Sequence, residues 1–238
     1  DERPMEPIYK PREPFESKGC EDPRIIEMDG TIYMTYTGYD GITPRVAITS
    51  ISKFDFLAKR WNWSKPYAIS PPNVPDKDAA IFPEKINGKY LMIHRVHDSI
   101  CADFADTLDF SKEKITECIE MLWPRWGMWD QEKVGIAAPP IKTKEGWLML
   151  YHGVSDRTIY RVGVVLLNRD NPTEIISRSA NPLLEPSKDY ERAGVVSNVV
   201  FPCGIVLRGE TLFIYYGAAD LTVAVATVPL DYILKSLS

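Results

Sequence analysis

The chain repeats one pattern of strands and turns four times along its 238 residues. Each copy runs from a proline-led apolar stretch through a tight turn containing glycine to an aromatic or apolar strand, and then through a small polar turn to a further apolar strand. The copies occupy residues 22–41, 82–98, 139–156 and 201–220, and their trailing strands lie at 45–51, 100–105, 160–167 and 221–228. Their second strands begin at Tyr33, Tyr90, Trp147 and Leu212, at intervals of 57, 57 and 65 residues.

Each copy predicts a small antiparallel meander. Asp29-Gly30 and Asn87-Gly88 are two-residue hairpin signals, and the runs beside them are rich in Ile, Val, Tyr and Thr. A meander of this size cannot bury both of its faces by itself, so we expect the units to stack radially as the blades of a β-propeller. A β-sandwich with accidental internal similarity is the alternative. The one expected helix is at 230–238, and residues 109–122 fit either a helix or an outer strand with its turn.

The length allows one large all-β domain or two small domains, and the repeat favours a single domain over residues 1–238. The first residues are charged and rich in proline, unlike a signal peptide, and no apolar run reaches the ~18 residues of a membrane helix. The formal net charge of −5 argues against nucleic acid. We therefore expect a cytoplasmic protein that binds small molecules, with no membrane or nucleic-acid partner and possible homo-oligomers.

The cysteines predict neither a zinc site nor a disulfide framework, because no CxxC pair is present. Free thiols in a reducing cytoplasm are expected for all of them: Cys20, Cys101, Cys118 and Cys203.

Equivalent positions in successive blades lie on a ring around the propeller axis. Alignment of the second strands places Arg95 and His152 at one level with Gly38 and Gly217. Two large cations opposite two glycines indicate an anion pocket with space for a ligand. The alternatives are that Arg95 is a surface ion-pair residue and that His152 is a satisfied core histidine.

Two aspartates occupy loops at the ends of the repeats. Asp22 opens the first copy, and Pro23 pre-sets an extended entry into the innermost strand, which would fix the carboxylate near the axis. Asp220 closes the last copy after three small residues, which indicates close approach of the backbone to a ligand. A turn-capping role is the alternative for each.

Two further groups of residues are ambiguous. His94 and His97 form an HxxH, but residues three apart on a strand point to opposite faces, so we expect no metal site. Three tryptophans cluster in one segment: Trp123, Trp126 and Trp129. Clustered aromatic rings line sugar clefts in some proteins and pack between blades in others.

Several long motifs, in order along nearly the whole chain, resemble glycoside hydrolase family 130, the β-mannoside phosphorylases and related mannosidases. They are EDPRI at 21–25, YMTYTGYDG at 33–41, KDAAIFPEKINGKYLMIHR at 77–95, APPIKTKEGWLMLYHGV at 138–154 and SNVVFPCGIVLRGETLFIYYGAAD at 197–220. The resemblance implies the family's five-bladed propeller. Four blade repeats are visible in this sequence, and the N-terminal blade of the family is apparently missing.

The resemblance also implies a role for individual residues. Asp22 of EDPR would be the catalytic acid, Asp220 would bind the mannosyl ring of the donor, and Tyr160 and Asn198 would contact the acceptor. The implied phosphate-binding residues are basic: Lys77, Arg95, Lys133 and His152. Inorganic phosphate would be a co-substrate, with no cofactor and no metal.

The residue types fit that chemistry. A phosphorylase needs an acid but no base, because phosphate is already an anionic nucleophile that has only to be positioned. The implied reaction is inverting phosphorolysis of β-mannosides, such as β-1,4-mannosyl glucose, mannosyl N-acetylglucosamine or mannooligosaccharides, to α-mannose 1-phosphate. The alternatives are a hydrolysing β-mannosidase and, because the first blade is absent, a propeller that binds sugar or phosphate without turnover.

Overall fold

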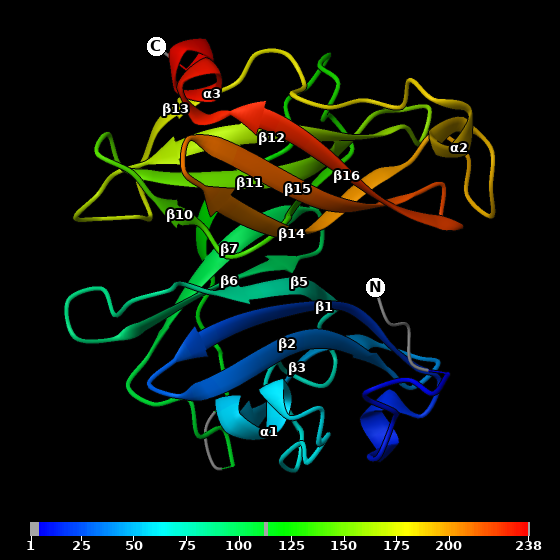
Figure 1. Cartoon of the computed structure of the whole chain (residues 1–238), viewed down its shortest axis with the longest axis vertical. Helices are drawn as coiled ribbons and strands as arrows, with labels where there is room; N and C mark the ends of the chain where they lie inside the picture. The colour runs from blue at the N-terminus through cyan, green and yellow to red at the C-terminus, as the bar shows by residue number, and fades with distance from the viewer. Residues whose placement is uncertain (1–4, 112–113, 238) are drawn as a thin grey trace.

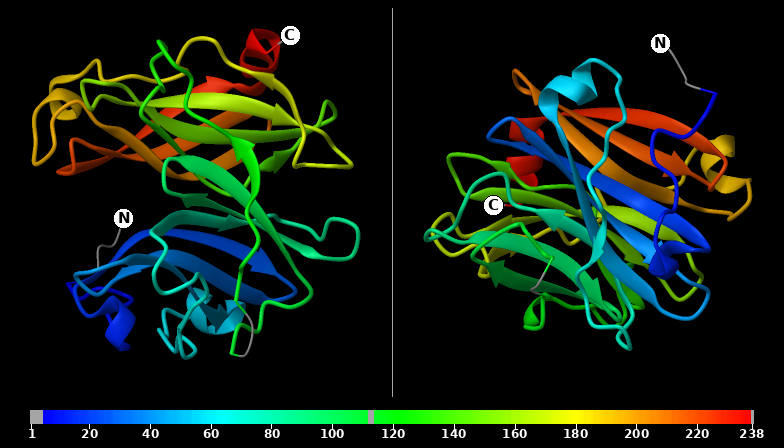
Figure 2. Two further views of the ribbon diagram at one scale, coloured as in Figure 1. Left: turned by 180° about the vertical axis from the view of Figure 1, so that it is seen from behind. Right: turned by 90° about the horizontal axis from the view of Figure 1, so that it is seen from below.

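The computed structural model describes residues 5–111 and 114–237. Its strands form four antiparallel sheets that follow one another as the blades of a β-propeller (Figure 1). The first two blades fill the lower half of Figure 1 and the last two the upper half, and the views in Figure 2 show the same order from behind and from below. The prediction of an all-β propeller with four visible blades is confirmed, and the β-sandwich alternative is wrong.

The blades contain three to five strands each. Blade 1 consists of β1 (Gly19–Met28), β2 (Thr31–Tyr39), β3 (Pro44–Ser52) and β4 (Tyr67–Ala68). Blade 2 consists of β5 (Asp76–Ile81), β6 (Tyr90–Val96), β7 (Ser99–Ala105) and β8 (Ile119–Leu122). Blade 3 consists of β9 (Lys133–Ile136), β10 (Ile141–Lys142), β11 (Trp147–Val154), β12 (Tyr160–Leu167) and β13 (Ile175–Arg178), with β9 and β10 both paired to β11. Blade 4 consists of β14 (Val200–Arg208), β15 (Thr211–Ala218) and β16 (Thr222–Pro229).

The expected C-terminal helix is confirmed as α3 (Leu230–Ser236). The expectation that it is the only helix is wrong, because the chain also forms α1 (Lys53–Leu57), α2 (Asp189–Arg192) and the 3-10 turn η1 (Pro14–Glu16). Each of these is about one turn long, too short to leave a helical period in the sequence. No helix in the described part of the chain is long and apolar enough to cross a membrane.

The ambiguous stretch 109–122 ends in β8, the outer strand of blade 2, and its residues 112 and 113 lie outside the described ranges. Pairing of β7 with β8 brings Cys118 beside Cys101, and the two are joined in a disulfide. The expectation of a free thiol is therefore wrong for this pair, because spacing along the chain does not reveal which strands pair. Cys20 and Cys203 are free.

Both predicted hairpin turns are confirmed. Asp29 and Gly30 have φ of +49° and +76°, and Asn87 and Gly88 have φ of +50° and +82°. Positive φ at both central residues is the type I′ geometry that matches the twist of the flanking strands. The first turn joins β1 directly to β2, whereas the second is the tip of a longer connection between β5 and β6.

The core lies between the faces of neighbouring blades. All eight residues of β11 are buried, and between blades 2 and 3 the rings of Phe82 and Trp147 pack edge to face with centroids 5.1 Å apart. Further apolar clusters fill the spaces between blades 1 and 2 and between blades 3 and 4. Burial on both sides explains why the strands of the central blades are almost continuously apolar.

The innermost strands of blades 1, 2 and 4 each contain a β-bulge. The register shifts between Glu21 and Arg24 in β1, between Lys77 and Ala80 in β5, and between Pro202 and Gly204 in β14. A bulge re-aims the side chain of the extra residue. In these three blades, it does so on the strand that lies nearest the axis.

The ring alignment is wrong by one residue in blade 1. Strand register places Thr37 opposite Glu21 and Arg95 opposite Lys77, with one bulge following each pair, so Thr37 rather than Gly38 is the counterpart of Arg95. The unequal hairpin connections cause the offset. A Cβ on Gly38 would lie 2.8 Å from the ring of Phe15, so that space is filled by the protein.

Candidate functional site

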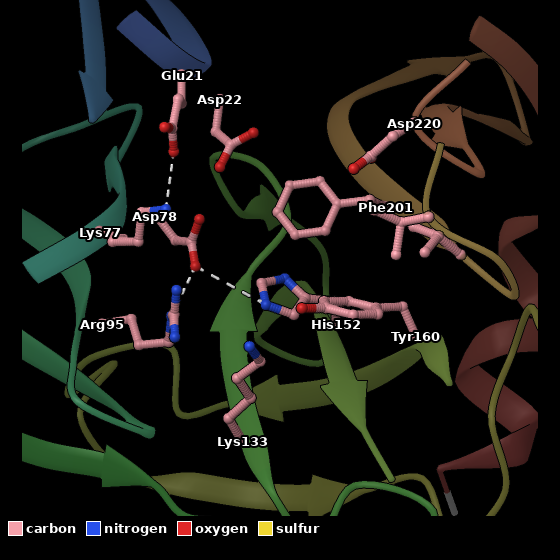
Figure 3. Close-up of a pocket in the computed structure, with 12 residues that line it drawn as sticks. Glu21, Asp22, Lys77, Asp78, Arg95, Lys133, His152, Tyr160, Phe201 and Asp220 are labelled. Atoms are coloured by element: carbon pink, nitrogen blue, oxygen red, sulfur yellow. Dashed lines mark hydrogen bonds and ion pairs between the residues drawn. The ribbon is translucent and has the colours of Figure 1, made fainter. Parts of the chain in front are cut away.

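A cavity of about 340 Å³ opens where the inner ends of the four blades meet (Figure 3). It is lined by Glu21, Asp22, Lys77, Asp78, Arg95, Lys133, His152, Tyr160, Val196, Val199, Phe201 and Asp220. Seven of the eight residues named from the sequence are therefore brought together. The exception is Asn198, whose side chain is not part of the lining and whose carbonyl accepts a hydrogen bond from the Tyr160 amide at 3.0 Å.

Asp22 lies on the bulge of β1, with φ of +54°. The expectation of an extended backbone here is wrong, because the residue adopts a left-handed conformation and Pro23 occupies the bulge, where no ladder hydrogen bond is needed. Burial raises the pKa of Asp22 to about 6, and the negative charge of Asp78 adds to that rise. A carboxyl group with such a pKa can hold a proton close to neutral pH.

Asp78 occupies the corresponding bulge of β5, with φ of +52°. Its side chain is 1% exposed, its Oδ2 accepts a hydrogen bond from Arg95 Nε at 2.7 Å, and its Oδ1 lies 3.5 Å from Arg24 Nη2. Burial would raise the pKa of Asp78, but the positive charges of Arg95 and Arg24 hold it well below its usual range. Asp78 is therefore ionised.

Arg24 connects opposite sides of the axis. Its Nε and Nη2 donate to the carbonyls of Ala137 and Ile136, at 2.9 and 2.7 Å, so blade 1 is tied to blade 3. A buried guanidinium needs such acceptors, because an unpaired buried charge is strongly unfavourable.

His152 is a neutral side chain in this site. It is 1% exposed, and burial lowers its pKa to about 3, although Asp78 acts in the opposite direction. Its ring packs against Phe201, with centroids 4.6 Å apart, and its Nε2 lies 3.7 Å from Asp78 Oδ2. The expectation of two cations, Arg95 and His152, is therefore wrong for His152.

Gly135 on β9 provides the room for this arrangement. A Cβ at this position would lie 2.3 Å from His152 Cε1 and 2.7 Å from Asp78 Oδ2. No real Cβ makes contacts that short, so only glycine allows the histidine and the carboxylate to approach the strand so closely.

Three permanent cations remain in the lining. Lys77 Nζ donates to Glu21 Oε2 at 2.7 Å, Arg95 is paired with Asp78, and Lys133 Nζ lies 5.3 Å from the centroid of the Tyr160 ring. Side chains of this kind bind phosphate-sized dianions through charge-assisted hydrogen bonds. On the other side of the cavity in Figure 3, Asp220 approaches from the loop after β15.

The histidine pair and the tryptophan cluster lie outside this lining. His94 Nδ1 contacts Asp76 at 2.9 Å and its Nε2 contacts Asp103 at 2.8 Å. In the described ranges, no group of three or more His, Cys, Asp or Glu residues is arranged to hold a metal ion. Trp129 stacks on Tyr151 at 5.7 Å, which fits the packing interpretation, whereas Trp123 and Trp126 are exposed.

Sequence reasoning missed Glu21, Asp78, Val196, Val199 and Phe201 in the lining. Glu21 and Asp78 lay within quoted motifs, next to Asp22 and Lys77. The signal that was available was a second acidic residue at the same place in the next blade's inner strand.

The chain matches a known protein family over its whole length. The family model described as beta-1,4-mannooligosaccharide phosphorylase matches residues 1–238. The chain is 38% identical over 221 residues to a 1,2-beta-oligomannan phosphorylase and 39% identical over 230 residues to a beta-1,2-mannobiose phosphorylase, both of Thermoanaerobacter sp. (strain X514). These matches cover 92% and 95% of this chain, and 71% and 72% of the relatives.

The solved structure of beta-1,2-mannobiose phosphorylase from Listeria innocua in complex with beta-1,2-mannobiose superposes with a TM-score of 0.87 at 32% identity. That match covers 98% of this chain and 65% of the solved chain, so the sequence spans about two thirds of the length of its relatives. By its whole-length match and these relatives, the chain belongs to glycoside hydrolase family 130.

Proposed function

We propose that this protein catalyses inverting phosphorolysis of β-mannosides, in which inorganic phosphate cleaves the glycosidic bond and α-mannose 1-phosphate is released. One observation carries the proposal: a buried carboxyl group with a raised pKa, Asp22, shares a single cavity with the cations Lys77, Arg95 and Lys133. This combination supplies an acid for the leaving group and a binding site for an anionic nucleophile. The family and the relatives named above support the same reaction.

The proton balance of the reaction needs only one acid. An oxygen of the phosphate attacks C1 of the mannosyl ring while the bond from C1 to the glycosidic oxygen breaks. The proton of Asp22 passes to that oxygen, directly or through a hydroxyl of the sugar, and the alcohol leaves. The monohydrogen phosphate that attacked gives up its own proton as mannose 1-phosphate forms, which restores the protonated acid.

The cations would bind phosphate, whereas the acid would protonate the leaving group. Lys77, Arg95 and Lys133 would hold the phosphate and neutralise part of its charge, and neutral His152 would add a hydrogen bond rather than a charge. Arg95 is held by Asp78 and His152 is packed against Phe201 before phosphate binds, so these two side chains would need little reorganisation at the moment of attack.

The sugar would lie between the acid and the far side of the cavity. Asp220 would accept hydrogen bonds from hydroxyls of the mannosyl ring, and the Tyr160 ring would offer a flat apolar face to the acceptor. Asn198 would act on the acceptor side only if its side chain turned toward the cavity. The two Thermoanaerobacter relatives favour β-1,2 linkages as the first to be tested, whereas the family description favours β-1,4.

A hydrolysing β-mannosidase is the second candidate, because Asp220 places another carboxylate in the cavity with Asp22. An inverting hydrolase uses such a second carboxylate to activate water. The presence of Lys77, Arg95 and Lys133 in the cavity argues for phosphate instead, since hydrolysis does not require three cations.

One assay tests the proposal against its alternatives. The protein is incubated with phosphate and either β-1,2- or β-1,4-mannobiose, and products are followed by ³¹P NMR. We expect phosphate-dependent α-mannose 1-phosphate, and we expect Asp22→Asn to lower kcat by about 10²- to 10⁴-fold while phosphate still binds. Free mannose formed without phosphate would establish the hydrolase, and binding without turnover would establish a binding module.

A further inference from the structure

Three nitrogen-containing side chains surround the carboxylate of Asp78. Its Oδ2 is 2.7 Å from Arg95 Nε and 3.7 Å from His152 Nε2, and its Oδ1 is 3.5 Å from Arg24 Nη2. The Asp78 side chain is nearly inaccessible and yet lines the cavity that contains Asp22. Phosphorolysis with Asp22 as the acid gives Asp78 no role.

Asp78 and Asp22 are structural counterparts in adjacent blades. Both are extra residues on a bulge of the innermost strand, and both have the left-handed backbone that this position imposes, with φ of +52° and +54°. A non-glycine residue in this conformation costs free energy, and such residues concentrate at functional sites. The repeat has thus placed two carboxylates in one cavity.

The two carboxylates differ in their partners. Arg24 shows the difference best, because its Nη2 faces the carboxylate of Asp78, whereas its Nη1 donates to the main-chain carbonyl of Asp22 at 2.9 Å. Arg95 adds a direct hydrogen bond to Asp78. When two neighbouring carboxylates have unequal partners, the one with the stronger cationic partners stays ionised. Its negative charge then disfavours ionisation of the other, which keeps its proton.

We propose that Asp78 is the ionised partner of Asp22: a positioning residue whose buried negative charge, held by Arg95 and Arg24, keeps on Asp22 the proton that phosphorolysis requires. This inference rests on the proposed function, because it assigns the purpose of the proton.

Some of the charged groups around Asp22 raise its pKa and others lower it. Asp78 from β5 and Glu21 from β1 raise the pKa of Asp22 in addition to burial, whereas Arg24 and Lys77 lower it. The thiol of Cys203, from the bulge of β14, faces the same group, and its own pKa is raised to about 11 by burial, so it is neutral. Asp78 is the strongest of the charged contributions that raise the pKa of Asp22. Only burial raises that pKa more.

The test is the pH dependence of Asp78→Asn, a variant that keeps the shape of the side chain and removes its charge. Loss of the charge lowers the pKa of Asp22, so the alkaline limb of the pH profile moves to lower pH by about one unit. The ratio of variant to wild-type kcat should therefore recover about five-fold between about pH 7.5 and about pH 5. A purely structural role predicts the same ratio at both pH values.

The matched control is Asp103→Asn. Asp103 is a carboxylate in the same blade, 3% exposed and hydrogen-bonded to His94, but it does not line the cavity. Its kcat ratio to wild type should stay constant across the same pH range. A constant ratio for Asp78→Asn, or an equal recovery for Asp103→Asn, would overturn the proposal. Absence of mannose 1-phosphate from the wild-type protein would instead count against the proposed function.

A second measurement covers the case in which Asp78→Asn does not fold. Carboxyl carbons of the ¹³C-labelled wild-type protein are titrated by NMR, with Asp22→Asn used to assign the Asp22 signal. We expect Asp22 to titrate near pH 6 while a second buried aspartate stays ionised throughout the acid range. Titration of Asp22 at the ordinary value for an aspartate would overturn the proposal without any reference to activity.

Discussion

Lys77 Nζ donates to Glu21 Oε2 at 2.7 Å, so a cation of the cavity is bound to a carboxylate one residue from the proposed acid. Phosphate must compete with this carboxylate for the same ammonium group. The ion pair is partly exposed, with side chains 29% and 42% accessible, so water weakens it. The basic character of the cavity is therefore smaller than its count of lysine and arginine side chains implies.

Replacement of Glu21 by Gln should release Lys77 for phosphate. We expect the KM for phosphate to fall about two- to five-fold, in line with the small free energy of exposed ion pairs. Initial rates at varied phosphate and saturating mannoside measure the effect. Glu27→Gln is the control, because Glu27 forms a comparably exposed pair with Lys53 at 3.1 Å away from the cavity. A higher KM for phosphate in Glu21→Gln would show that the pair orients Lys77 instead of occupying it.

Replacement of Arg95 by Ala should affect phosphate far more than sugar. The guanidinium donates hydrogen bonds to Asp78 and to the carbonyl of His97, so its orientation is fixed before any ligand binds. Loss of a charge-assisted hydrogen bond should raise the KM for phosphate about 10- to 100-fold. The KM for the mannoside should change much less. Arg161→Ala, which removes an arginine paired with Glu185 outside the cavity, should change neither constant. An unchanged phosphate dependence would remove Arg95 from the phosphate site.

The propeller could be predicted from the sequence because the hairpin turns and the period of the repeat can be recognised along the chain. The repeat pointed to Arg95 and His152, the loop positions pointed to Asp22 and Asp220, and the family resemblance supplied the other three of the seven residues that line the cavity. Prediction from the sequence was wrong or incomplete where the three-dimensional environment of a residue determines its chemistry. The charge of His152 depends on burial, and the role of Asp78 depends on a bulge that shifts the register. The disulfide of Cys101 with Cys118 depends on which strands pair.

His94 should make the stability of the fold depend on pH. It lies between Asp76 and Asp103; burial alone would lower its pKa, but the two carboxylates raise it to about 9. A pKa above the unfolded value means that the stabilisation is complete below about pH 6.5 and is lost as the pH rises through about 9. The Tm should therefore fall more steeply over this range in the wild-type protein than in His94→Gln.

The control for that experiment is His97→Asn, which alters the other member of the pair. His97 has φ of +54°, a conformation that asparagine tolerates, and it lies two residues beyond Arg95 on the tip between β6 and β7. Its Tm should follow the wild-type pH dependence. Equal slopes for His94→Gln and the wild-type protein would show that His94 is not charged in the folded state.

Gly135 should tolerate no side chain. The Cβ of Gly135→Ala would meet His152 Cε1 at 2.3 Å and Asp78 Oδ2 at 2.7 Å, so both groups must move. A displacement of about 1 Å at a site of this kind can lower kcat/KM about 100-fold, and we expect a loss of that order for phosphorolysis. Gly204→Ala is the control, because its Cβ would lie 3.7 Å from the Cβ of Tyr215, an ordinary contact. Circular dichroism and Tm establish that both variants fold. Full activity of Gly135→Ala would mean that the positions of His152 and Asp78 are not critical for the reaction, and the arrangement proposed for the acid and its ionised partner would then be wrong.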